Sequence, residues 1–131
     1  MLILLLTICY QTIQPNEIIF TSQTRGSKEI ISIRKDKITF VKNEEQEVYE
    51  LALSDWNKLI KSIQEIDVNK IQDYPAPSKE HARDAALHST LSIVVNDHVY
   101  TSDTFDDTKA PRELMKLMDC IIHLKKKYLR E

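Results

Sequence analysis

Two polar segments that contain arginine are the strongest candidates for a binding site. Arg25 lies in a short turn-forming segment, and Arg83 lies next to Asp84 in a long polar connection. A guanidinium group presents a planar fork of N–H donors that matches a carboxylate, and Asp103 and Asp106 could be its partners. These residues could form a ligand-binding mouth, or they could form ion pairs that hold the loops together. Ion pairs often serve structure, which favours the second interpretation.

The sequence contains no local signature of a catalytic or metal site. Nucleophilic catalysis needs a serine or cysteine beside a base, yet no Gly-x-Ser-x-Gly segment or comparable signature occurs. The acidic segment 103–107 lacks the spacing, the central glycine and the glutamate of a calcium-binding loop. The histidines lack the spacing of a zinc site; they are His81, His88, His98 and His123. We therefore predict no catalytic residue and no metal.

Composition excludes further classes of function. Gly26 is the only glycine, whereas glycine-built phosphate loops need several, so no nucleotide cofactor is expected. The 18 basic and 20 acidic residues give a net charge of -2, which does not favour nucleic acid as a partner. Basic residues do gather at 125–127 and at Arg130, but cations at the end of a helix also stabilise its carbonyl end.

The N-terminus reads as an export signal. Residues 2–8 form an apolar run that is too short to span a bilayer, and Cys9 follows directly, as in a bacterial lipoprotein signal. Cys9 is therefore a candidate for lipid attachment, although Ile8 stands where that signal has a small residue. Alternatively, residues 1–10 form a buried strand of a cytoplasmic protein. Cys120 is the other cysteine and fits a small buried hydrophobe of the last helix.

The remaining chain predicts one domain over residues 17–131, after an apolar leader and tether over 1–16. Short β-branched runs separated by turn residues predict strands near 18–22, 31–34, 38–41 and 48–51. A second hairpin is predicted from 91–95 and 99–102.

Two amphipathic helices are predicted between and after these strands. Ser54 would cap the first, whose apolar residues recur at offsets of three and four, and Pro111 suits the start of the last. Short hairpins imply antiparallel neighbours, and both apolar stripes need a sheet to cover. We therefore predict an α+β two-layer sandwich of about six strands, in the order ββββ-α-ββ-α, with both helices on one face.

Four short segments resemble those of small envelope proteins and lipoproteins of bacteria in the Bacteroidetes lineage. These segments are Thr24–Ser27, Ala76–Ser78, Arg83–Ala86 and Thr101–Asp106, and the resemblance covers roughly residues 18–124. It departs at the leader, which lacks a basic start and a small residue before the cysteine. The resemblance implies a location in the cell envelope, and it implies no activity.

We therefore expect a non-catalytic domain, exported to the cell envelope, that binds a protein or a small ligand. It would meet the membrane only through a lipid anchor. Two alternatives from other classes are an inhibitor of a secreted hydrolase and a small enzyme. An apolar patch on the uncovered sheet face would favour a protein partner, whereas a pocket holding titratable groups with shifted pKa values would favour the enzyme.

Overall fold

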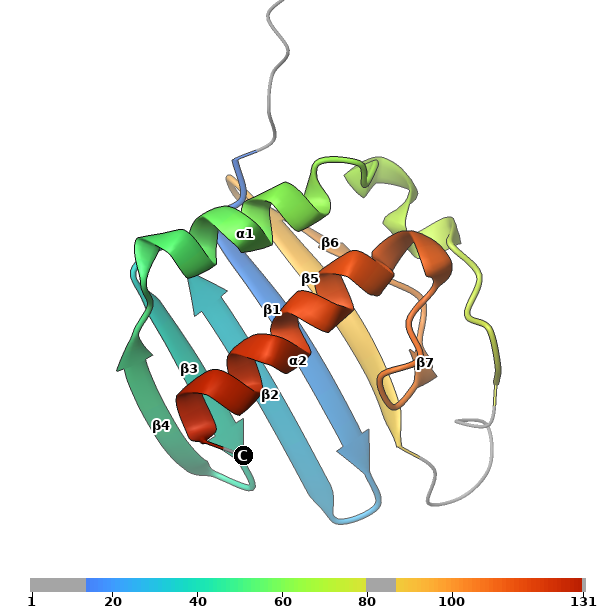
Figure 1. Ribbon diagram of the computed structural model, residues 1–131. Coiled ribbons are helices and arrows are strands. Elements are labelled where there is room, and N and C mark those ends of the chain that lie inside the picture. The colour runs from blue at the N-terminus through green and yellow to red at the C-terminus, as the bar shows by residue number, and fades with distance from the viewer. Residues whose placement is uncertain (1–13, 80–86, 131) are drawn as a thin grey trace, which may run out of the picture.

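The computed structural model describes residues 14–79 and 87–130, which form one sheet covered by helices on one face (Figure 1). The strands are β1 (Glu17–Thr24), β2 (Ser27–Arg34), β3 (Lys37–Lys42), β4 (Glu45–Glu50), β5 (His88–Val95), β6 (His98–Thr101) and β7 (Phe105–Asp106). The helices are α1 (Leu53–Ile63), the 3-10 helices η1 (Val68–Asp73) and η3 (Arg112–Leu114), and α2 (Met115–Leu129).

The predicted α+β sandwich with an antiparallel sheet is confirmed. The strands lie in the order β4-β3-β2-β1-β5-β6, and every pair is antiparallel. Figure 1 shows α1 and α2 side by side on the same face of this sheet, with α2 crossing it obliquely. The structure adds β7, which pairs with the first residues of β5 and lies off the main path of the sheet.

The period-two pattern of the strands decides which side chains enter the core. In β1, Ile18, Phe20 and Ser22 are buried while the residues between them are half-buried. Successive side chains of a strand point to opposite faces, so these alternate residues lie under the helices. The apolar stripes of α1 and α2 meet them, and Leu59, Leu117 and Ile121 are at most 1% exposed.

Among the described residues, three of the four hairpin turns contain a residue with a left-handed backbone. Gly26 has φ +87° in the β1–β2 turn, where a side chain would be strained. Asn43 has φ 49° and Asn96 has φ 54°, in the β3–β4 and β5–β6 turns. Asparagine enters this region more readily than most residues, so these two turns form without glycine; Glu44, next to Asn43, also has a positive φ of 76°.

The prediction that Ser54 caps the first helix is wrong. The helix begins at Leu53, its N-cap is Ala52, and no side chain caps it. Ser54 therefore lies within the first turn. The backbone N–H of Trp56, from which a Ser54 cap could accept, donates instead to the carbonyl oxygen of Ala52 at 3.1 Å. The backbone N–H of Ala52 itself donates to the hydroxyl of Tyr128 from α2.

The contacts of the domain begin before Glu17, within the segment that the sequence predicts as a tether. Pro15 is buried, and the backbone N–H of Asn16 donates to the carbonyl oxygen of Val94 at 2.8 Å. The side chain of Asn16 also accepts from the backbone N–H of Asn96. Residues 15 and 16 thus belong with the sheet. The leader 1–13 and Cys9 lie outside the described residues.

Candidate functional site

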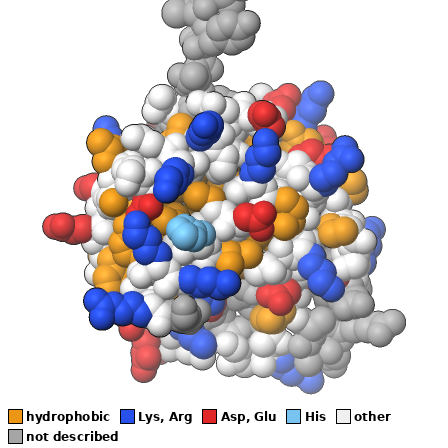
Figure 2. Space-filling view, viewed as in Figure 1, with side chains coloured by type: hydrophobic (Ala, Val, Ile, Leu, Met, Phe, Trp, Pro, Cys, Tyr) orange, Lys and Arg blue, Asp and Glu red, His pale blue; other side chains and the backbone are white. Residues whose placement is uncertain are grey.

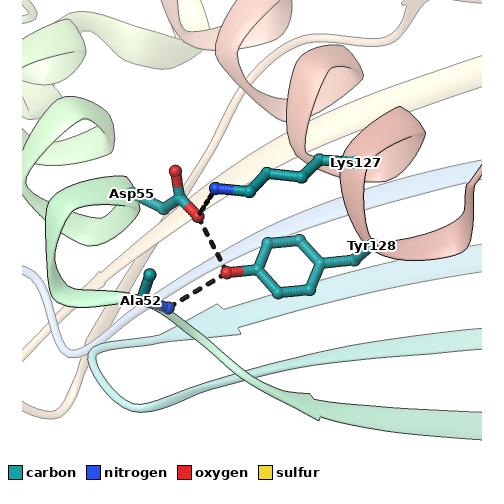
Figure 3. Close-up of polar contacts among 4 residues, drawn as sticks. All are labelled: Ala52, Asp55, Lys127 and Tyr128. Carbon is teal, nitrogen blue, oxygen red and sulfur yellow. Dashed lines mark hydrogen bonds and ion pairs between the residues drawn. The ribbon is translucent and has the colours of Figure 1, made fainter.

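A polar contact around a buried carboxylate joins the beginning of α1 to the end of α2 (Figure 3). The carboxylate of Asp55 accepts hydrogen bonds from Lys127 Nζ and Tyr128 Oη, each at 2.8 Å, through the same oxygen. Tyr128 Oη also accepts from the backbone N–H of Ala52 at 3.0 Å. Asp55 is 2% exposed. All four groups are engaged with one another, which makes this contact a clamp between two helices.

The charge on Asp55 is stabilised by the clamp. Burial alone would raise the pKa of the Asp55 carboxyl, but the hydrogen bonds from Lys127 and Tyr128 outweigh burial and lower the pKa below its ordinary value. The bond to Asp55 in turn raises the pKa of Lys127. The ion pair is therefore present at neutral pH. Because the Asp55 carboxylate is buried and is bonded to groups of the same chain, we assign this contact to stability.

The feature best suited to hold a ligand is a cavity of about 370 Å³ between α2 and the sheet. Its apolar wall comes from the core faces of β1 and β2 on one side and from α2 on the other. The residues of this wall are Phe20, Ile31, Met118, Ile121 and Ile122. Such a wall provides burial without directional contacts, which is the usual basis of small-molecule sites.

A buried serine supplies a polar group to the wall. Ser22 lines the cavity and is 8% exposed, and its hydroxyl oxygen accepts from the hydroxyl of Ser89 at 3.1 Å. Both serines occupy core-facing positions of their strands, where an aliphatic residue would fill the space. Among the described contacts Ser22 acts only as an acceptor, so its O–H group remains a donor that a bound molecule could use.

An ion pair closes one end of the cavity. Lys125 Nζ of α2 lies 2.8 Å from Glu29 Oε1 of β2, and Lys42 is the cross-strand neighbour of Glu29. The same three residues line a smaller cavity of about 140 Å³ toward β4, so the pair stands between two hollows. Of the basic residues near the C-terminus, Lys125 and Lys127 thus serve to dock α2 on the sheet and on α1.

The sequence-predicted binding residues lie near the other end of this cavity. Arg25 is exposed at the tip of the β1–β2 turn, and Asp106 is buried in β7. Both belong to the same end of the sheet, because His88 pairs with Gln23 on one side and with Asp106 on the other. Their neighbours in sequence, Thr24 and Asp107, line the cavity.

Two of the predicted residues, Asp106 and Asp103, each accept a hydrogen bond in the structure. The carboxylate of Asp106 accepts a hydrogen bond from the hydroxyl of Ser78. Asp103 is exposed, and its carboxylate accepts from the backbone N–H of Thr104 at 2.9 Å, which shapes the loop before β7. Arg83 and Asp84 lie outside the described residues.

The sequence does not predict the cavity itself. A signal for it does exist, because Ser22 and Ser89 interrupt apolar period-two patterns at core-facing positions. That signal is weak alone, since serine is common at strand ends. The two serines form one polar group only because β1 pairs with β5, which makes Ser22 and Ser89 direct neighbours.

Cys120 and the acidic groups offer no competing site within residues 14–79 and 87–130. Burial raises the pKa of the Cys120 thiol, which disfavours the reactive thiolate. No three His, Cys, Asp or Glu side chains in this part of the chain gather closely enough to hold a metal ion. No helix there is long and apolar enough to cross a membrane. The chain matches no protein-family model, and no curated protein is similar to it in sequence.

Proposed function

We propose that this protein is a non-catalytic binding domain that holds a small, largely apolar ligand between α2 and the sheet. The observation that supports this proposal is the cavity of about 370 Å³, which falls within the ordinary range for small-molecule sites. Its apolar wall would shelter the ligand from water. The hydroxyl of Ser22 would meet a polar atom and orient it.

The polar groups of the cavity favour binding over catalysis. Of the four described charged residues that line the cavity, Glu29 and Lys125 neutralise each other at 2.8 Å, and Lys42 and Asp107 are exposed to solvent. Asp55, whose pKa is displaced, is engaged by Lys127 and Tyr128 in the clamp and does not line the cavity. A site of this kind recognises shape and apolar surface.

Binding is tested with the fluorescent probe 1-anilinonaphthalene-8-sulfonate, whose fused rings suit an apolar cavity. At about 0.3 kcal/mol per heavy atom, a probe of this size would bind with a Kd on the order of tens of micromolar. We expect a saturable fluorescence increase with one probe per chain. Ser22→Leu would place a larger side chain in the cavity, and we expect it to weaken binding by about tenfold or more.

The matched control is Ser32→Leu, the same change on the half-buried side of β2 that faces away from the helices. It should leave probe binding unchanged. Equal losses in both variants, or binding by neither variant nor the wild type, would contradict the proposal. Circular dichroism of each variant establishes that the fold is retained.

We further propose that the domain acts in the cell envelope, to which the apolar run 2–8 and Cys9 would direct it. The test is mass spectrometry of the chain expressed in its native host and fractionated by compartment. We expect a mature N-terminus at or after Cys9, with acyl groups if the cysteine anchors the protein. Recovery of the chain from the cytosol with Met1 intact would contradict export.

A further inference from the structure

The face of the sheet away from the helices, called the outer face below, has two central rows of side chains without a single charge. The first row runs across the strands through Val48, Thr39, Ser32, Ile19, Ser92 and Thr101. The second runs through Gln46, Val41, Ile30, Thr21 and Thr90. The chain as a whole is 29% charged, so about three charges would be expected among these residues.

This composition suits a covered surface. A sheet face in water usually carries lysine, glutamate and other charged residues, as the helical side of this molecule does (Figure 2). The central rows instead carry aliphatic side chains and hydroxyl groups, and Ser92 and Thr101 bond each other at 2.9 Å. At the margins Val48 is 52% exposed and Val99 is 62% exposed. These two valines lie on the two edge strands, β4 and β6, so apolar side chains are exposed on both sides of the uncharged centre.

The outer face is large enough for a dimer. The outer face has six strands, spaced about 4.8 Å apart, and four rows of side chains, namely the two central rows and one row at each end, spaced about 6.8 Å apart. Together they cover on the order of 700 Å². Stable interfaces bury roughly 800 Å² on each partner. Two such faces can therefore pack as a sandwich, in which sheets stack about 10 Å apart and cross at about 30°.

The row at one end of the outer face carries Glu50, Lys37, Arg34 and Glu17, and its central pair, Arg34 and Glu17, can bond between two copies. Arg34 Nε lies 3.1 Å from Glu17 Oε2, and these residues belong to β2 and β1 at the centre of the strand order. A two-fold axis parallel to the strands, passing between β1 and β2, lays β1 of one copy over β2 of the other. Each Arg34 then faces Glu17 of the second copy.

The charges also discriminate against the other face-to-face arrangement. A two-fold axis across the strands would lay β2 over β2 with its ends exchanged, so that Arg34 would face Lys28 of the second copy. Like charges opposed in this way are destabilising. With the axis parallel to the strands, Lys28 of one copy instead faces Gln23 of the second copy. Within one chain, Gln23 is the cross-strand neighbour of Lys28 in β1. In this arrangement, no two residues of like charge in these rows face each other between the copies.

We infer that two copies of this chain pack through their outer faces as a two-fold dimer with its axis parallel to the strands. The uncharged rows form the centre of the interface, and Arg34 and Glu17 pair between the copies at its end. The cavity beneath α2 lies on the opposite side of the sheet and stays open in the dimer. This inference does not depend on the proposed ligand.

The first test places a charge at the centre of the interface. Sedimentation equilibrium of the full chain at about 100 µM is expected to give the mass of a dimer. Thr39→Lys would bury an unpaired ammonium group between the sheets and is expected to weaken dimerisation by about 100-fold or more. Asn57→Lys introduces the same lysine on the exposed surface of α1 and should leave the dimer intact.

The second test exchanges charges between copies. Arg34→Glu alone and Glu17→Arg alone each place like charges together, and each is expected to be monomeric. An equimolar mixture of the two variants restores opposite charges across the interface and is expected to form a heterodimer. A structural effect on the separate chains could not produce this rescue.

A monomeric wild type at about 100 µM would overturn the inference, whether the outer face is bare or covered by residues 1–13 of the same chain. A dimer that survives Thr39→Lys would place the interface elsewhere. Dimers of both single charge variants, with no gain on mixing, would contradict the orientation of the axis and so overturn the inference as stated.

Discussion

Replacing Asp55 with alanine is expected to lower the free energy of unfolding by about 3 kcal/mol at neutral pH. The change removes the acceptor for both Lys127 and Tyr128, and it leaves the tyrosine hydroxyl without its carboxylate partner in a nearly closed site. This expected loss is at the low end of the range for breaking a buried ion pair, because Lys127 is about half exposed. Urea unfolding followed by the fluorescence of Trp56 measures it.

Asp119→Ala is the matched control, because Asp119 is an exposed aspartate of α2. It should change the free energy of unfolding by less than about 0.5 kcal/mol. A loss of similar size in both variants would show that the clamp contributes nothing specific, and the assignment of Asp55 to stability would then be wrong.

The contribution of Asp55 should also depend on pH. Its pKa in the folded protein is lower than in the unfolded chain, so folding favours the charged form. This stabilisation is fully present above the ordinary carboxyl pKa and is lost as the pH falls through the folded pKa. We therefore expect the difference in stability between wild type and Asp55→Asn to shrink on acidification from pH 7 to about pH 3. A difference that stays constant would contradict this.

Replacing Phe105 with alanine is expected to cost about 4 kcal/mol. Phe105 belongs to the two-residue strand β7, is 0% exposed, and stands opposite Ser89 in the sheet. Removing its ring would leave a void at the end of the core where the chain returns from β6 toward α2. Chemical unfolding measures the loss.

Phe105→Leu serves as the comparison, since it keeps an apolar side chain of intermediate size and should cost about 1 kcal/mol. If alanine and leucine at this position have equal effects, the ring does not pack as the structure shows, and β7 would not be an anchor of the sheet.

The hairpins and helices could be predicted because their signals are local. Alternating residues such as Ile31 and Ile33, turn residues such as Gly26, and the apolar stripe of α2 each lie within a few residues of one another. The strand β7 could not be predicted, because two residues are too short to show a period.

The clamp and the cavity depend on residues that are distant in sequence. Tyr128 and Asp55 are 73 positions apart, and Ser89 and Ser22 are 67 positions apart. The wrong prediction at Ser54 has a local cause. A serine before an apolar stripe has high capping propensity, yet the backbone N–H of Trp56 already donates to the carbonyl oxygen of Ala52, so the helix begins before Ser54.

The ligand is proposed to enter between α2 and the sheet. The most direct measurement is a ¹⁵N amide spectrum of the labelled full chain, recorded with increasing 1-anilinonaphthalene-8-sulfonate. We expect the largest shifts at cavity residues such as Ser22, Ser27 and Ile122, which lie on separate elements around one hollow. Shifts concentrated instead at Ser32 and Thr39 on the outer face, or no saturable shifts at all, would contradict the account.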